Sequence, residues 1–381
     1  MRLPSEEAEF GRLALALFAL QFTHNAPYRR LCEAQHVSPS TLDDWREVPA
    51  MPTSAFREFE VSCLPPAQRT RVFHSSGTTG QRPSRHFHDA ASLELYEASL
   101  LPWFEAHLLA GLGGATHDLD WKCALRMICL TPPPEQAPHS SLVHMFATLR
   151  RHWRAADALF AGTIEADGTW RVDFDATVAA LGECGEASRP VLLPGTAFSF
   201  AHLLDHLTEA KLRFALPAGS RVMETGGYKG RSRALPKAEL HARITERLGV
   251  PPSLIVCEYG MSELSSQAYD HVSGDVWQVT SGGSAPRPSP LDPRPSSCCL
   301  SLGTRHFHFP PWARVQLVSP ETGRAVGEGE TGLIRVFDLA NVFSVMAIQT
   351  DDLGVRRGNG FELLGRAALA DPRGCSLMAA S

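Results

Sequence analysis

Short, uniformly apolar runs alternate with helical patterns along this chain, and that alternation restricts the fold more than any other feature. Runs that are apolar throughout are typical of strands buried on both faces, and they occur at residues 124–130, 191–193, 254–257 and 333–337. Helical patterns occur at residues 6–35, 92–109, 198–212 and 236–248. Several of the runs lead into a loop that precedes a helix. This order predicts an α/β fold with ligands near the carboxyl ends of the strands.

Two of the helical patterns indicate which side chains face a core. In the first, Phe10, Leu13, Leu17 and Leu20 recur at helical spacing before Pro27 interrupts the pattern. The pattern at 236–248 starts at a proline that suits a first helical turn, and its apolar stripe consists of Leu240, Ile244 and Leu248.

The composition is that of an ordinary globular enzyme. Of 381 residues, 44% are hydrophobic and 20% charged, and the net charge of −5 offers no electrostatic basis for binding nucleic acid or an anionic membrane. The apolar stretch at residues 13–20 is too short to span a bilayer, and Glu6, Glu7 and Glu9 stand where a secretory segment needs basic residues. Nine cysteines include no CxxC pair. We therefore expect a cytoplasmic protein without an integral membrane segment.

A loop rich in glycine and hydroxyl groups is the first candidate site. It consists of Ser75, Ser76, Gly77, Thr78, Thr79 and Gly80. Such stretches fold into turns whose backbone N–H groups surround an anion, and the hydroxyls add further donors. The lysine of a Walker loop is missing, so the pattern indicates nucleotide phosphates outside the ordinary P-loop class. A solvated turn is the alternative for a stretch of this composition.

A second glycine-rich stretch follows at residues 223–230. Gly226 and Gly227 allow the backbone to approach a flat base or a phosphate closely, and Lys229 brings a positive charge. A flexible turn before a helix is the alternative.

A third candidate site follows the apolar run at 254–257. Tyr259 and Gly260 suit adenine stacking at the end of a strand, and Glu263 suits magnesium, which commonly uses one or two carboxylates with substrate phosphates. Taken alone, Glu263 is better explained as a helix cap or a surface acid.

The fourth candidate site combines paired acids with a downstream cation. Asp351 and Asp352 precede a glycine, which is usual in a turn, but an aspartate can also accept hydrogen bonds from both ribose hydroxyls. Arg366 would add a cation near the nucleotide.

The order of these motifs resembles that of the adenylate-forming superfamily. Within that superfamily the chain is most similar to the acyl-protein synthetases of the LuxE type. The similarity is carried by residues 21–29, 49–56, 140–142, 195–198, 224–227, 310–312, 338–341 and 373–377. The resemblance implies an α/β adenylate-forming domain at residues 1–366, a truncated C-terminal tail at 367–381, and ATP with Mg²⁺ as cofactors.

The resemblance also implies a reaction. A long-chain fatty acid and ATP give acyl-AMP and pyrophosphate, and the acyl group passes to Cys375 in the tail for delivery to an acyl-reductase partner. A thiolate attacks mixed anhydrides well, and neighbouring Arg373 would lower the thiol pKa. An exposed thiol without a role is the alternative for Cys375.

The chain departs from the superfamily pattern in two places. The mobile C-terminal domain, with its catalytic lysine, has no counterpart in the sequence, so either Lys229 supplies that charge or the reaction proceeds without a lysine. Asp351 also stands where the common Thr-Gly-Asp motif has glycine, which leaves Asp352 as the residue that should hold the ribose.

Other acceptors and another class of function remain open. An acyl- or aryl-CoA ligase, or a ligase for an acyl-carrier protein, would use a different acceptor from Cys375, and an inactive scaffold would keep the fold without the chemistry. An acyl tunnel is required in the leading interpretation. Ala197, Phe198 and Phe200 are candidates to line it, and core packing explains them equally well.

Overall fold

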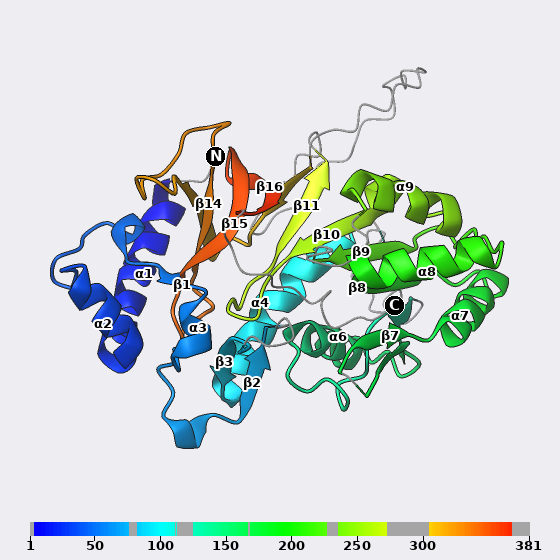
Figure 1. The fold of residues 1–381 in the computed structure, drawn as a ribbon, viewed down its shortest axis with the longest axis horizontal. Coiled ribbons are helices and arrows are strands. Elements are labelled where there is room, and N and C mark those ends of the chain that lie inside the picture. The colour runs from blue at the N-terminus through cyan, green and yellow to red at the C-terminus, as the bar shows by residue number, and fades with distance from the viewer. Residues whose placement is uncertain are drawn as a thin grey trace.

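The computed structural model describes residues 4–75, 82–110, 112, 125–166, 168–226, 235–272 and 305–367. Within these residues, twelve strands form one mixed sheet in the order β13-β14-β15-β16-β12-β11-β10-β9-β8-β4-β5, with β1 (Met51–Pro52) paired to β15 (Figure 1). The large sheet confirms the expected α/β class. No helix in the described part of the chain is long and apolar enough to cross a bilayer.

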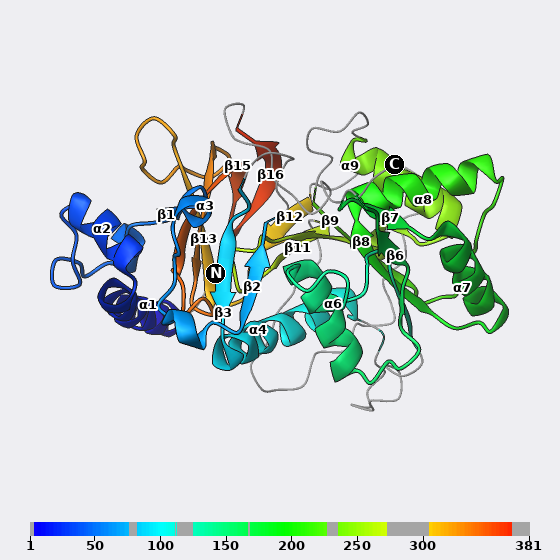
Figure 2. The ribbon, with the colours of Figure 1, turned by 60° about the horizontal axis from the view of Figure 1, so that its bottom comes forward.

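One half of the sheet is parallel. It contains β4 (Arg126–Cys129), β5 (Leu159–Phe160), β8 (Val191–Thr196), β9 (Arg221–Thr225) and β10 (Ile255–Tyr259). Three of the four apolar runs expected to be strands are β4, β8 and β10. Helices cover both faces: α4 (Ala90–Leu108) and α6 (Ser141–His152) on one, α7 (Phe174–Glu186), α8 (Ala197–Glu209) and α9 (Lys237–Leu248) on the other (Figures 1 and 2).

Burial on both faces explains why these strands are apolar throughout. Successive side chains of a strand point to opposite faces. Leu193 and Ile255 accordingly pack with α8 and α9, whereas their neighbours Leu192 and Val256 pack with α4 and α6. Ala197 and Phe200 belong to the core on the α8 side, so for these two residues core packing is confirmed.

The other half of the sheet is antiparallel. It contains β11 (Ala268–Val272), β12 (Arg305–His308), β13 (Ala313–Val318), β14 (Thr331–Asp338), β15 (Ala347–Arg357) and β16 (Gly360–Arg366). The fourth apolar run lies in β14. Two small sheets, β2 (Arg71–His74) with β3 (Arg85–His88) and β6 (Gly162–Ile164) with β7 (Trp170–Val172), lie outside the large one.

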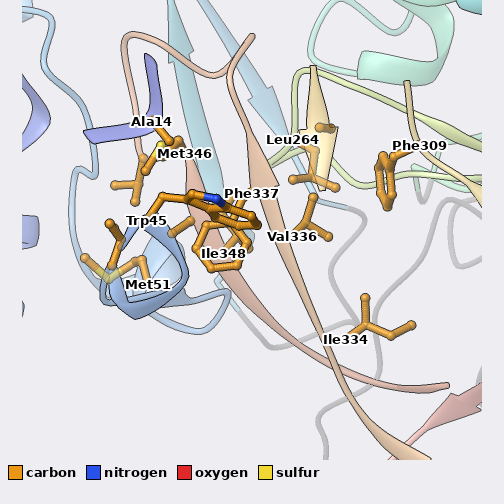
Figure 3. Packing of buried hydrophobic residues seen from close by; sticks show 14 of the residues in the cluster. Ala14, Trp45, Met51, Leu264, Phe309, Ile334, Val336, Phe337, Met346 and Ile348 are labelled. Carbon is orange, nitrogen blue, oxygen red and sulfur yellow. The ribbon is translucent and has the colours of Figure 1, made fainter. Parts of the chain in front are cut away.

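The N-terminal segment packs against this antiparallel half. It comprises α1 (Pro4–His24), α2 (Ala26–Ala34), a 3-10 turn at Trp45–Glu47 and the short helix α3 (Ala55–Glu58). Trp45 lies between Phe10 of α1 and Phe337 of β14, with ring centroids 4.9 and 4.8 Å away. Figure 3 shows the Trp45 ring against Phe337. The first helix and the last strands therefore share one hydrophobic core.

Two details of the N-terminal helices differ from expectation. The helical pattern is interrupted at Asn25, whose side chain accepts the Tyr28 N–H as an N-cap, while Pro27 sits in the first turn of α2. Leu13 and Leu20 are about 40% exposed, at 42% and 41%, because the buried stripe of α1 runs through Phe10, Ala14 and Phe18 instead. The stripe at Leu240, Ile244 and Leu248 is confirmed, since all three are buried in α9.

Candidate functional site

The glycine-rich loop connects the two strands of a small hairpin. Strands β2 and β3 pair antiparallel from Arg71 opposite His88 to His74 opposite Arg85, and Ser75 follows directly. The Ser84 N–H donates to the Ser75 hydroxyl (2.9 Å), and the Ser75 N–H donates to the Ser84 carbonyl (3.2 Å). Ser75 therefore closes the base of the loop. The other predicted phosphate contacts, Ser76, Gly77, Thr78, Thr79 and Gly80, lie outside the described residues.

The hairpin is docked on the segment that carries Glu263. The buried imidazole of His86 donates from Nδ1 to the Ser262 carbonyl (2.7 Å), and its Nε2 lies 3.1 Å from Oδ1 of Asn341. The hydroxyls of Ser84 and Ser262 are 3.4 Å apart. Asn341 in turn donates to the Glu263 carbonyl (2.9 Å). These contacts hold the base of the glycine-rich loop against the candidate magnesium ligand.

Glu263 itself is an interior carboxylate. It is 1% exposed, which rules out the surface-acid interpretation, and the Ser262 hydroxyl donates to its Oε2 (3.0 Å). The carboxylate is an oxygen donor of the kind that Mg²⁺ prefers. The donor chemistry therefore fits the predicted ion.

Asp338 organises the chain that follows Glu263. Its carboxylate accepts the Ser265 N–H (2.9 Å), the Ser266 hydroxyl (2.7 Å) and the Ala340 N–H (3.1 Å). Burial raises the pKa of Asp338, and these hydrogen bonds oppose the increase. Sequence analysis included Asp338 and Asn341 in a block of family resemblance without giving either a role. Their position in that block was the one signal that pointed to them.

Tyr259, Asp352 and Arg366 are brought together on the antiparallel side of the same segment. The Tyr259 hydroxyl donates to Oδ2 of Asp352 (3.0 Å), and Nε of Arg366 donates to Oδ1 (3.3 Å). Arg366 also reaches Oδ2 of Asp351 (3.2 Å). Both oxygens of Asp352 therefore have partners, and the cation expected near the nucleotide lies beside the carboxylate expected to hold the ribose.

The ring of Tyr259 is surrounded by phenylalanines. Phe307, Phe309 and Phe361 meet it edge to face, with centroids 6.0, 6.2 and 5.2 Å away. The side chain is buried, and burial raises the pKa of its hydroxyl well above the usual value. This packing fixes the position of the hydroxyl that contacts Asp352.

Glycine is required where β9 and β10 end. Gly226 has φ of +76°, a conformation that residues with a side chain rarely adopt. A Cβ at Gly260 would lie 2.1 Å from Oε1 of Glu258. Glu258 is buried and accepts the Thr225 hydroxyl, and burial, together with nearby Glu224, raises its pKa to about 7. Gly227, Lys229 and Cys375 lie outside the described residues.

No family model matches the chain, but two curated relatives align with nearly all of it. The long-chain-fatty-acid–luciferin-component ligase of Aliivibrio fischeri is 22% identical over 393 residues, covering 97% of this chain and 87% of the relative. The ligase of the same name from Vibrio harveyi is 21% identical over 378 residues, covering 96% and 86%.

Solved structures agree on the fold. A 2-hydroxyisobutyryl-CoA ligase in complex with 2-HIB-AMP and CoA has a TM-score of 0.63 at 16% identity, covering 96% of this chain and 69% of the other. An open conformation of that ligase scores 0.62 at 15% identity, covering 94% and 69%. The fold is that of the adenylate-forming ligases. The chain resembles the LuxE-type acyl-protein synthetases over nearly its whole length, and both comparisons support the prediction of a ligase.

Proposed function

We propose that this protein uses ATP to activate a long-chain fatty acid as acyl-AMP and then transfers the acyl group to its own Cys375. One observation carries the proposal: the base of the glycine-rich loop is docked on the Glu263 segment, and Asp352 with Arg366 lies at the other end of that segment. The names of the relatives support a fatty acid as the substrate.

In the first step an oxygen of the fatty carboxylate attacks the α-phosphorus of ATP. The bond from that phosphorus to the bridging oxygen breaks, and pyrophosphate leaves. Residues 76–80 would contact the β- and γ-phosphates, and Asp352, positioned by the Tyr259 hydroxyl, would hold the ribose. Residues 226–227 would lie against the adenine. Glu263 and the phosphate oxygens would hold Mg²⁺, which when bound offsets charge on the phosphate oxygens. Lys229 supplies positive charge to the transition state.

In the second step the Cys375 thiolate attacks the acyl carbon, a thioester forms and AMP leaves. A reductase partner then accepts the acyl group. The proposal places this chemistry in the cytoplasm. All five cysteines in the described residues are free thiols, which suits a reducing compartment.

Two measurements test the two steps separately. Pyrophosphate exchange into ATP, driven by a tetradecanoate-like acid, tests activation, and no exchange with any carboxylate contradicts it. Labelled acid should then appear on the protein as a hydroxylamine-sensitive thioester in the wild type and be lost in Cys375→Ser. Full labelling of that variant contradicts the acceptor, and labelled coenzyme A or carrier protein identifies the alternative ligases.

A further inference from the structure

A basic cavity of about 600 Å³ lies beside α6. Its wall adjoins the hairpin that carries the glycine-rich loop, because the carbonyl of His139, between the lining residues Pro138 and Ser140, accepts the His74 N–H (2.9 Å). Its wall includes Arg71 of β2, Arg150 and Arg151 of α6, and Arg154 just beyond that helix, whereas Glu135 is the one carboxylate among its lining residues. Arg71 starts the strand that ends at His74, so about 13 Å of extended chain separates it from the glycine-rich loop. None of the lining residues belongs to the candidate nucleotide site.

Most of the arginine charge in the cavity has no acidic partner. Arg151 pairs with Glu97 (2.6 Å), whereas Arg71 donates to the Pro138 carbonyl (3.0 Å) and Arg150 lies 5.4 Å from the Phe160 ring centroid. In the parts of the chain that the structure describes, no ion pair joins Arg71, Arg150 or Arg154 to a carboxylate. The chain as a whole carries a net charge of −5, so this concentration of positive charge is local.

The end of α6 accounts for only part of this cluster. Cations in the last turn of a helix stabilise its dipole, and Arg150 and Arg151 lie there. Arg71 comes from another element, and Arg154 lies past the helix with φ of +53°. A residue in this left-handed conformation commonly terminates a helix, and Arg154 terminates α6. The conformation is held by hydrogen bonds from the Trp153 N–H to the Leu149 carbonyl and from the Ala155 N–H to the Arg150 carbonyl.

We propose that this cavity binds a small organic molecule bearing one or two phosphate groups, at a site separate from the ATP site. Guanidinium groups match phosphate oxygens with paired hydrogen bonds, and three arginines without acidic partners suit more than one negative charge. The volume lies in the range of small-molecule sites and exceeds what a free phosphate fills. Ala137, Ala147 and Ala155 in the wall offer apolar contact for the organic part.

Titration calorimetry with inorganic pyrophosphate and with phenyl phosphate tests this site. Because pyrophosphate is also a product of the proposed reaction, we expect two binding events, one at the cavity and one at the ATP site. The double variant Arg150→Gln/Arg154→Gln should weaken binding at the cavity at least tenfold. Thr79→Ala should weaken only the other. Arg324→Gln, at an exposed arginine far along the chain, is the matched control and should change neither.

The outcomes separate this proposal from the proposed function. If pyrophosphate and phenyl phosphate bind the double variant as they bind the wild type, the cavity site is overturned. It is also overturned if the protein binds a hexapeptide of glutamate but neither phosphate compound, because the cavity would then not be a phosphate site. If the double variant does not fold, the exposed Arg154→Gln alone must still weaken one event. Fatty-acid-driven pyrophosphate exchange is expected to persist in the double variant, and its absence from the wild type would count against the proposed function alone.

Discussion

The two ends of the 259–263 segment are held by different kinds of interaction. At the Glu263 end the contacts join an imidazole, an amide and hydroxyls, all buried, together with the interior carboxylate of Asp338. At the Tyr259 end the carboxylate of Asp352, which is also buried, is paired with the Arg366 guanidinium. We call these the hairpin side and the aspartate side. The hairpin side depends on the buried His86 imidazole and the Asp338 carboxylate, whereas the aspartate side depends on an ion pair, so changes in pH and single substitutions should separate them.

The largest expected effect is that of Asp338→Ala on the hairpin side. The substitution leaves the buried N–H groups of Ser265 and Ala340 and the Ser266 hydroxyl without their acceptor, and each unsatisfied group costs roughly 1–3 kcal/mol. We expect a loss of about 3 kcal/mol in the free energy of unfolding by urea. Asp338→Asn keeps an acceptor oxygen and should lose less, and Asp175→Ala, at an exposed aspartate, should lose almost nothing. Equal losses in all three variants would contradict the role of Asp338.

Acid should weaken the hairpin side next. Burial lowers the pKa of His86, and burial with neighbouring His86 lowers that of His88 to about 2, so the unfolded chain binds protons more readily than the folded one. The folded state therefore keeps its full stability with respect to these two imidazoles above pH 6.5 and loses stability as the pH falls below 6.5. For His88 alone the loss is about 2 kcal/mol by pH 5, and His86 adds to it.

Urea midpoints between pH 5 and 8 measure this effect. His88→Gln removes one titrating group, so the urea midpoint should fall less steeply below pH 6.5. His24→Gln, at an exposed histidine, should leave the pH dependence of the midpoint unchanged. A wild-type midpoint that does not fall below pH 6.5 would show that these imidazoles are not held neutral.

Glu258 should give the opposite response to pH. Its pKa is raised to about 7, so the folded state binds the proton more tightly and its stabilisation is lost as the pH rises through 7. Gln imitates the neutral acid. The free energy of unfolding of Glu258→Gln minus that of the wild type should therefore increase by about 2 kcal/mol as the pH rises from 5 to 8. A constant difference between the two proteins across this range would argue that Glu258 is already ionised at pH 5.

The smallest effect is expected on the aspartate side, from Tyr259→Phe. The lost hydroxyl donates to Asp352, and one such hydrogen bond contributes about 1 kcal/mol. We also expect a severalfold higher KM for ATP, because the carboxylate proposed to hold the ribose is less well positioned. Tyr269→Phe is a matched control, since in the described residues the buried Tyr269 hydroxyl has no hydrogen-bond partner. If both variants behave alike, the contact with Asp352 contributes nothing.

Much of the fold could be predicted because its signals are local. The apolar runs at β4, β8, β10 and β14 and the stripe of α9 follow from side-chain periodicity, which depends on near neighbours alone. The predictions that were wrong concern which face of a helix packs against a neighbouring element. Leu13 of α1 is apolar but exposed, because the face toward β14 is set by Phe10, Ala14 and Phe18.

The candidate site could be predicted only in part, for the same reason. The motif order suggested Tyr259, Asp352 and Arg366, and the structure brings them together. It also assigns Ser75 to the base of the loop, where its hydroxyl accepts the Ser84 N–H. His86 was not suggested at all, because a histidine in a short strand has no pattern of its own.

The sequence by itself determined the strands β4, β8, β10 and β14, the apolar stripe of α9, the glycines at the strand ends and the resemblance to the LuxE-type synthetases. Only the tertiary structure decided how the site is supported. The imidazole of His86 meets Ser262 at a separation of 176 positions and Asn341 at 255. Contacts of that range arise when the sheet and its helices bury their apolar faces together, so they depend on the whole core and on no local run of residues.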